Sequence, residues 1–219
     1  MTNKLRWKFL NNVDGTIASN YNQSFTWVVG EWRHVQGTIR ACGNGLHASK
    51  RITEALGYVQ GDVLARVEVK GESDERDDKS AHQSMRIVKA YRWTKLDSVA
   101  LAVYVAELVI DNFESARPGD DRPRKAIESA KAYLADPNAA AYSAYANSAY
   151  AAYTSAAYTS AAAYTASAAY SAYTAAAAAA ANSAYAAANA AKAAANASDT
   201  KKINAWLNAR VSQLEEITA

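Results

Sequence analysis

Residues 39–49 hold the densest group of chemically active side chains, in the order Ile-Arg-Ala-Cys-Gly-Asn-Gly-Leu-His-Ala-Ser. Two glycines between Cys42 and His47 predict a tight turn that brings the thiol and the imidazole to a common point. A thiol becomes a nucleophile when a base or a positive charge lies beside it. The alternative is a buried cysteine beside a histidine that hydrogen-bonds the loop backbone. We favour this structural interpretation, because no Asp or Asn stands out as the third member of a catalytic triad.

The same residue types are also metal ligands. Cys42 is the only cysteine, which excludes an intrachain disulfide, and the histidines are His34, His47 and His82. No pair among these four has the spacing of a known zinc loop. We therefore predict neither a metal site nor a cofactor.

Residues 1–95 supply the elements that must position the motif. Alternating apolar side chains indicate four strands, at 5–10, 24–29, 63–69 and 85–93. Residues 52–58 can form a short helix, and the charged stretch 72–83 predicts a loop. The expected fold class is α+β: a small mixed α/β head at 1–95 packed on an all-α, Ala/Tyr-rich helical bundle at 96–219.

The second half is dominated by a block at 139–198, in which 34 of the 60 residues are Ala. No Gly or Pro interrupts it, which favours helix. A single helix of this length would run about 90 Å, so we expect several packed helices or association with partners, including other copies of the chain. Its polar Tyr, Asn, Ser and Thr side chains surround the predicted helix, which argues against a membrane span. The N-terminus has no apolar signal core.

The charge is unevenly distributed. The net charge is +3 overall; residues 1–95 hold 15 Lys/Arg and 10 Asp/Glu (+5), and residues 96–138 hold 5 and 8 (−3). This balance gives no strong signal for nucleic acid, but the basic head suits a small anionic ligand. A tryptophan can stack on a base and an arginine can meet a phosphate. The candidate ligand-binding residues are Arg6, Trp27, Arg33, Arg40, Cys42, His47 and Ser49.

Several short motifs follow one another through residues 5–95. They are Phe25-Thr26-Trp27-Val28-Val29-Gly30, Cys42-x-x-Gly45-Leu46-His47-Ala48, Val67-Glu68-Val69-x-Gly71 and Met85-Arg86-Ile87-Val88. This series resembles an uncharacterised domain common in tailed-phage genomes, whose hallmark is Cys, two residues, Gly, Phe/Leu, His, Ala. The resemblance implies a phage context and no mechanism.

The order of elements supports a second comparison. An Arg on the opening strand (Arg6) and a strand that ends near Ser49 are similar to the layout of ADP-ribosyltransferase folds. In those folds the two residues hold a dinucleotide and a late Glu performs the chemistry. Here the corresponding run is Ser80-Ala81-His82-Gln83-Ser84, so the resemblance implies binding of an NAD- or ADP-ribose-like ligand without turnover. An active transferase or hydrolase that uses His47 with Cys42 is the enzymatic alternative.

Residues 97–198 carry a further resemblance. The segment Asp121-Arg122-Pro123-Arg124-Lys125-Ala126-Ile127-Glu128, followed by the Ala-rich tract, resembles a helical domain that bears the name of an immunity protein in bacteria and is found fused in phage proteins. The resemblances together predict a non-enzymatic phage accessory protein in the host cytoplasm. It would bind and neutralise a host defence protein or a nucleotide-derived signal, in an anti-defence role. An oligomeric scaffold is the structural alternative.

Overall fold

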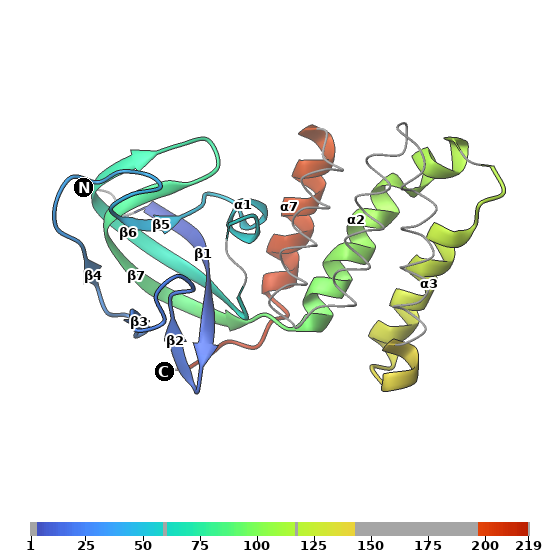
Figure 1. Ribbon diagram of the computed structural model, residues 1–219, viewed down its shortest axis with the longest axis horizontal. Helices are drawn as coiled ribbons and strands as arrows, with labels where there is room; N and C mark the ends of the chain where they lie inside the picture. The colour runs from blue at the N-terminus through green and yellow to red at the C-terminus, as the bar shows by residue number, and fades with distance from the viewer. Residues whose placement is uncertain (1–3, 59–60, 117, 143–196, 219) are drawn as a thin grey trace. The chain divides into compact units, whose positions relative to one another are not determined.

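The computed structural model describes residues 4–58, 61–116, 118–142 and 197–218 (Figure 1). The chain divides into two compact units, residues 1–93 with 207–219 and residues 94–206. Most of the Ala-rich block, residues 143–196, lies outside the described residues, and so does the predicted packing of its helices.

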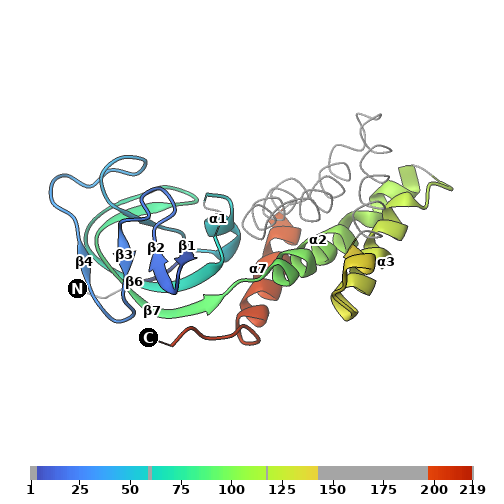
Figure 2. The same cartoon turned by 60° about the horizontal axis from the view of Figure 1, so that its bottom comes forward.

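The first unit is a sheet of antiparallel strands. The strands are β1 (Lys4–Val13), β2 (Thr16–Ala18), β3 (Thr26–Trp27), β4 (Arg33–His34), β5 (Leu46–Ala48), β6 (Val63–Glu75) and β7 (Ser80–Arg92). Their order is β3-β2-β1-β6-β7-β4, and β5 pairs with β7 outside this path. The sheet is strongly curved (Figure 2), and in its described part the only helix before β6 is the five-residue α1 (Ile52–Leu56).

The predicted fold class is wrong. The head is not a mixed α/β domain, because its strands pair antiparallel and its helix content is a single short helix among the described residues. An all-α bundle is not shown either: the described helices are α2 (Lys95–Ala116), α3 (Arg122–Ala135) and α7 (Ala197–Val211).

The largest local error concerns residues 72–83, predicted as a loop. They form the end of the β6–β7 hairpin, in which Ser73 pairs with His82 and Glu75 pairs with Ser80. Arg76 N donates to Lys79 O at 2.8 Å and closes the turn. Polar side chains do not prevent a ladder whose backbone groups hydrogen-bond each other, so composition alone misidentified this segment.

The core of the first unit lies on one face of the sheet. Alternate residues of β6 point to it, and strands β1, β3, β5 and β7 contribute to it as well. Together these five strands supply the apolar side chains of Leu10, Trp27, Leu46, Ala48, Val63, Ala65, Val67, Val69, Met85, Ile87 and Ala90. In β1, Leu10 pairs with Val63 and Lys8 pairs with Ala65. Since side chains two residues apart share a face, Lys8 lies on the same face as the core.

The opposite face of β1 is also covered. Phe9 meets the Trp93 ring edge-on, with centroids 5.6 Å apart, and α1 packs against β1. The C-terminal segment pairs with β7, where Ile217 N donates to Ala90 O at 2.8 Å. The middle of β1 is therefore covered on both faces, and Lys8, which shares the core face with Leu10, lies partly inside the unit.

In the second unit, α2 begins with a reciprocal cap. Asp97 Oδ2 accepts from Thr94 N at 2.8 Å, and Asp97 N donates to Thr94 Oγ1 at 3.3 Å. Pro123 occupies the first turn of α3, where its missing N–H costs no hydrogen bond. Within the described part of the chain, no helix is long and apolar enough to cross a membrane.

Candidate functional site

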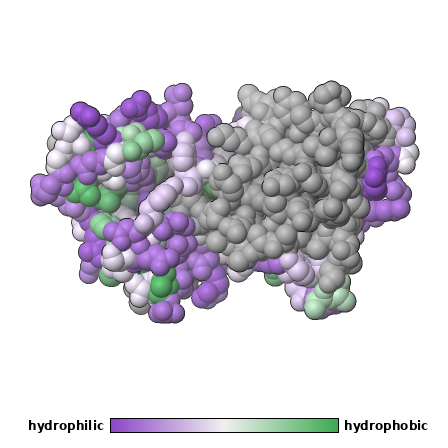
Figure 3. Space-filling model, in the orientation of Figure 1, coloured by the Kyte–Doolittle hydropathy of each residue, from purple (hydrophilic) through white to green (hydrophobic). Residues whose placement is uncertain are grey.

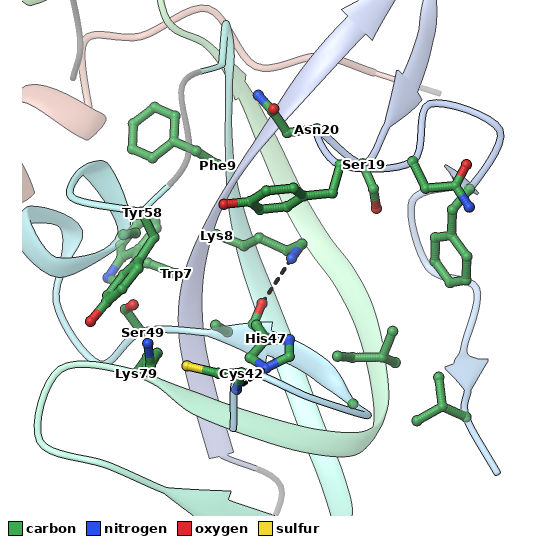
Figure 4. Close-up of a pocket in the computed structure, with 18 of the residues that line it drawn as sticks. Trp7, Lys8, Phe9, Ser19, Asn20, Cys42, His47, Ser49, Tyr58 and Lys79 are labelled. Carbon is green, nitrogen blue, oxygen red and sulfur yellow. Dashed lines mark hydrogen bonds between the residues drawn. The ribbon is translucent and has the colours of Figure 1, made fainter. Parts of the chain in front are cut away.

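A pocket of about 650 Å³ opens in the first unit. It lies beside β1 and is bordered by the segment between β2 and β3, the loop that ends in β5, the end of α1 and the turn of the β6–β7 hairpin (Figure 4). This volume suits a small molecule. Among its described lining residues the ionisable nitrogen groups are Lys8, His47 and Lys79, and none is Asp or Glu. The pocket is therefore electropositive.

Lys8 is the innermost of these charges. It is partly buried on the core face of β1, and its Nζ donates to the carbonyl oxygen of His47 at 2.8 Å. Burial lowers the pKa of Lys8 from 10.5 to about 8. No carboxylate among the described residues forms an ion pair with it. An ammonium held in this way stabilises a bound anion more strongly than an exposed lysine does.

His47 holds the loop that forms one wall of the pocket. Its Nε2 accepts a hydrogen bond from Cys42 N at 3.0 Å. Burial, together with the charges of Lys8 and Lys79, lowers the pKa of His47, so the ring is neutral at pH 7. Because the Nε2 lone pair is engaged by the loop backbone, this nitrogen is not available to take a proton from the thiol.

Cys42 lies at the exposed edge of the same loop. Its φ of 63° is in the left-handed region, as expected for a tight turn. A structural cysteine is expected to be buried, whereas Cys42 is exposed. The histidine nevertheless bonds the loop backbone, as the structural interpretation requires.

Lys79 carries the second positive charge. Its Nζ lies 4.4 Å from the centroid of the Tyr58 ring, and the Tyr58 hydroxyl donates to Asp78 Oδ2. A hydrogen bond with Cys42 is the largest cause that raises the pKa of Lys79, so it stays charged well above neutral pH. Figure 4 shows Lys79 beside Cys42 and Tyr58, and Lys8 beyond His47.

Aromatic side chains form much of the remaining wall. The Lys8 ammonium lies 6.0 Å from the Trp27 ring centroid, and Trp27 Nε1 donates to Ser19 Oγ at 2.9 Å. Phe25 meets Trp27 edge-on, at 5.4 Å between centroids. Tyr21 is 92% exposed although it also lines the pocket. It is one of four large hydrophobic side chains that are exposed among the described residues. The described surface is mainly hydrophilic in the view of Figure 3.

The structure brings together four of the seven candidate residues. The pocket is lined by Trp27, Cys42, His47 and Ser49. Two main-chain hydrogen bonds with Trp7 fix Ser49 in place.

The three candidate arginines do not line the pocket. Arg6 is buried and its Nη2 pairs with Glu75 at 3.2 Å. Arg33 lies over the Phe25 ring, with its guanidinium carbon 5.9 Å from the centroid. The Arg40 side chain is exposed, and its main chain closes the loop through Asn44.

Sequence reasoning missed Lys8, Lys79, Tyr58 and Tyr21 as site residues. The two lysines looked like ordinary surface charges in a strand and a polar stretch. One signal was present. Lys8 and Leu10 are two residues apart in β1 and therefore point to the same face, so the burial of Leu10 implies that the aliphatic part of the Lys8 side chain is buried too.

Potential metal ligands are dispersed. His34 Nδ1 contacts Ser84 Oγ at 2.9 Å, and His82 Nε2 contacts Ser80 Oγ at 2.7 Å. Burial, and then the charge of Arg6, lower the pKa of His82 to about 4. Across the described ranges, no three His, Cys, Asp or Glu side chains are grouped so that they could hold a metal ion.

Comparison with known proteins finds one family model that matches part of the chain. Residues 14–99 match a domain of unknown function, DUF7666, and this range includes most of the sheet and all pocket residues except those on β1. No curated protein and no solved structure matches the chain.

Proposed function

We propose that the first unit binds a small anionic, nucleotide-like ligand in the pocket beside β1. The observation that carries this proposal is Lys8: a partly buried ammonium that lines a pocket without acidic lining residues. Holding a desolvated charge disfavours the folded state, and a bound anion removes that penalty.

The walls favour a ligand that also has a flat, aromatic part. Phe25 and the exposed Tyr21 offer ring surfaces on which a base can stack. Asn20 and Asn22 lie in the same segment and carry amides that can read the edge of a base. A pocket of about 650 Å³ suits a mononucleotide or dinucleotide better than a long nucleic acid.

The biological role we propose is sequestration without turnover. The engagement of His47 Nε2 by the loop backbone supports binding over general-base chemistry. Together with the phage-type resemblances of the sequence, it leads us to propose a phage accessory protein that acts in the host cytoplasm. There it would remove a nucleotide-derived signal from a defence pathway. Capture of a host defence protein is the competing form of the same role.

A thermal-shift panel tests ligand binding. Nucleoside mono- and diphosphates, NAD and ADP-ribose at about 100 times their dissociation constant should stabilise the native protein by about 2.7 kcal/mol, which raises its melting temperature. Adenosine is the uncharged control and should have little effect. No shift with any nucleotide at millimolar concentration contradicts the proposal.

Binding should weaken as the pH rises from 7 to 9. With a pKa of about 8, Lys8 is charged below that pH and loses its proton above it, so affinity should fall by about tenfold over this range. The lowered pKa keeps His47 neutral, and the raised pKa keeps Lys79 charged, throughout the window. Calorimetric titration at pH 7, 8 and 9 measures the effect. The same titrations with the Cys42→Ser variant show whether the effect is independent of the Cys42 thiol. An affinity that does not change would show that Lys8 does not meet the ligand.

A further inference from the structure

The pocket contains two separate positive charges, which lie on different elements. Lys8 projects from the middle of β1, and Lys79 ends the turn between β6 and β7. Each is in electrostatic contact with His47, so both charges act on the same part of the pocket. In Figure 4, Cys42 and His47 lie between the side chains of Lys79 and Lys8.

Among the described residues, no carboxylate forms an ion pair with either lysine. The Lys8 ammonium donates to a carbonyl oxygen, and Lys79 contacts a tyrosine ring and a thiol. Asp78, next to Lys79 in the chain, accepts a hydrogen bond from the Tyr58 hydroxyl. By contrast, three basic side chains outside the pocket (Lys4, Arg6 and Lys50) share Glu75. The pocket therefore retains two charges for which a ligand can supply the partners.

From this arrangement we infer that the pocket has two anion subsites, Lys8 for one phosphoryl group and Lys79 for a second. This inference rests on the proposed function and narrows its ligand class to nucleotides with two phosphoryl groups: nucleoside diphosphates or pyrophosphate-linked dinucleotides. Lys79 lies at the edge with Cys42, which is exposed, and Lys8 lies inside. The second phosphoryl group consequently lies nearer to solvent.

His47 holds the two subsites apart. Its carbonyl oxygen fixes Lys8, and its ring fixes the Cys42 end of the loop beside Lys79. Since the ring is neutral, it adds no third charge. A ligand with a single phosphoryl group can meet only one lysine at a time and should bind more weakly.

Paired titrations with AMP and ADP, and with GMP and GDP, test the two subsites in the full chain. The wild-type protein should bind each diphosphate about tenfold more tightly than its monophosphate, as expected for one added charge-assisted contact. Lys79→Met should abolish that preference and leave monophosphate affinity nearly unchanged, and Lys79→Arg should retain the preference. Lys70→Met removes an equal charge from a lysine that stacks on Trp32 outside the pocket, and should have no effect.

The outcomes separate the two proposals. If mono- and diphosphates bind equally, or if Lys79→Met keeps the preference, the second subsite is wrong and nucleotide binding stands. If none of the four nucleotides binds to the wild-type protein, and NAD and ADP-ribose do not bind either, both proposals are wrong. Circular dichroism of each variant verifies that a lost preference does not reflect unfolding.

Discussion

Replacing Lys8 by methionine should weaken nucleotide binding by about 10- to 100-fold, the effect of losing a hydrogen bond to a charged group. The same change should raise the melting temperature of the unliganded protein by about 2–4 °C at pH 7, because a partly buried charge is removed from an apolar face. Calorimetry measures the first quantity and differential scanning calorimetry the second. Lower affinity together with higher stability is the signature of a binding residue.

The pH dependence provides the control for this variant. The folded-state pKa of Lys8, about 8, is below its value of 10.5 in an unfolded chain. The unfolded state therefore binds more protons between these values, and Lys8 makes wild-type stability rise with pH across that window. The stability advantage of Lys8→Met should shrink from pH 7 to pH 10. A variant that is less stable than wild type at pH 7 would show that the hydrogen bond to His47 O outweighs the cost of burial.

Substituting Gly45 by alanine should destabilise the first unit by about 2–3 kcal/mol, because the residue has a φ of +144° and a new Cβ would lie 2.8 Å from the Ala81 Cβ. Relief of this clash requires β5 to move away from β7. His47 and Cys42 would then lose their mutual hydrogen bond, and nucleotide affinity should fall with stability. Chemical denaturation gives the free energy of unfolding.

Gly43 is the matched control in the same loop. A Cβ there would lie 3.5 Å from Arg40 Cβ, which is ordinary contact, and its φ is not in the left-handed region. Gly43→Ala should therefore change stability by less than about 1 kcal/mol. Equal effects of the two substitutions would indicate that the turn tolerates a side chain at both positions.

Strands of the first unit were partly predictable from the sequence. Alternation in residues 63–69 correctly indicated β6, because one face of that strand is core. Short edge strands were not predictable: β3 has two residues, although apolar residues suggested a strand at 24–29. Such pieces are defined by their pairing with β2 and not by their own composition.

The candidate site was predictable where glycines fix the backbone. The two glycines around Asn44 indicated the turn that joins Cys42 to His47, and the structure has that turn. The two lysines of the pocket, Lys8 and Lys79, were not predicted as site residues. In a strand with one solvent face, Lys8 would lie on the face opposite to Trp7 and Phe9 and point to water, but β1 is covered on both sides. The two-residue spacing of Lys8 and Leu10 was the one signal for its burial, and only the tertiary arrangement shows that a pocket opens beside it.

The pKa of Lys8 tests the central claim most directly. Nuclear magnetic resonance of the lysine side chains, assigned by comparison with Lys8→Met, would follow its titration in the free protein and in the presence of ADP. We expect a pKa of about 8 in the free protein. It should rise by at least about one unit with ADP, because a phosphate beside the ammonium favours its charged form. A pKa near 10.5 in the free protein, or one that ADP leaves unchanged, would contradict the account.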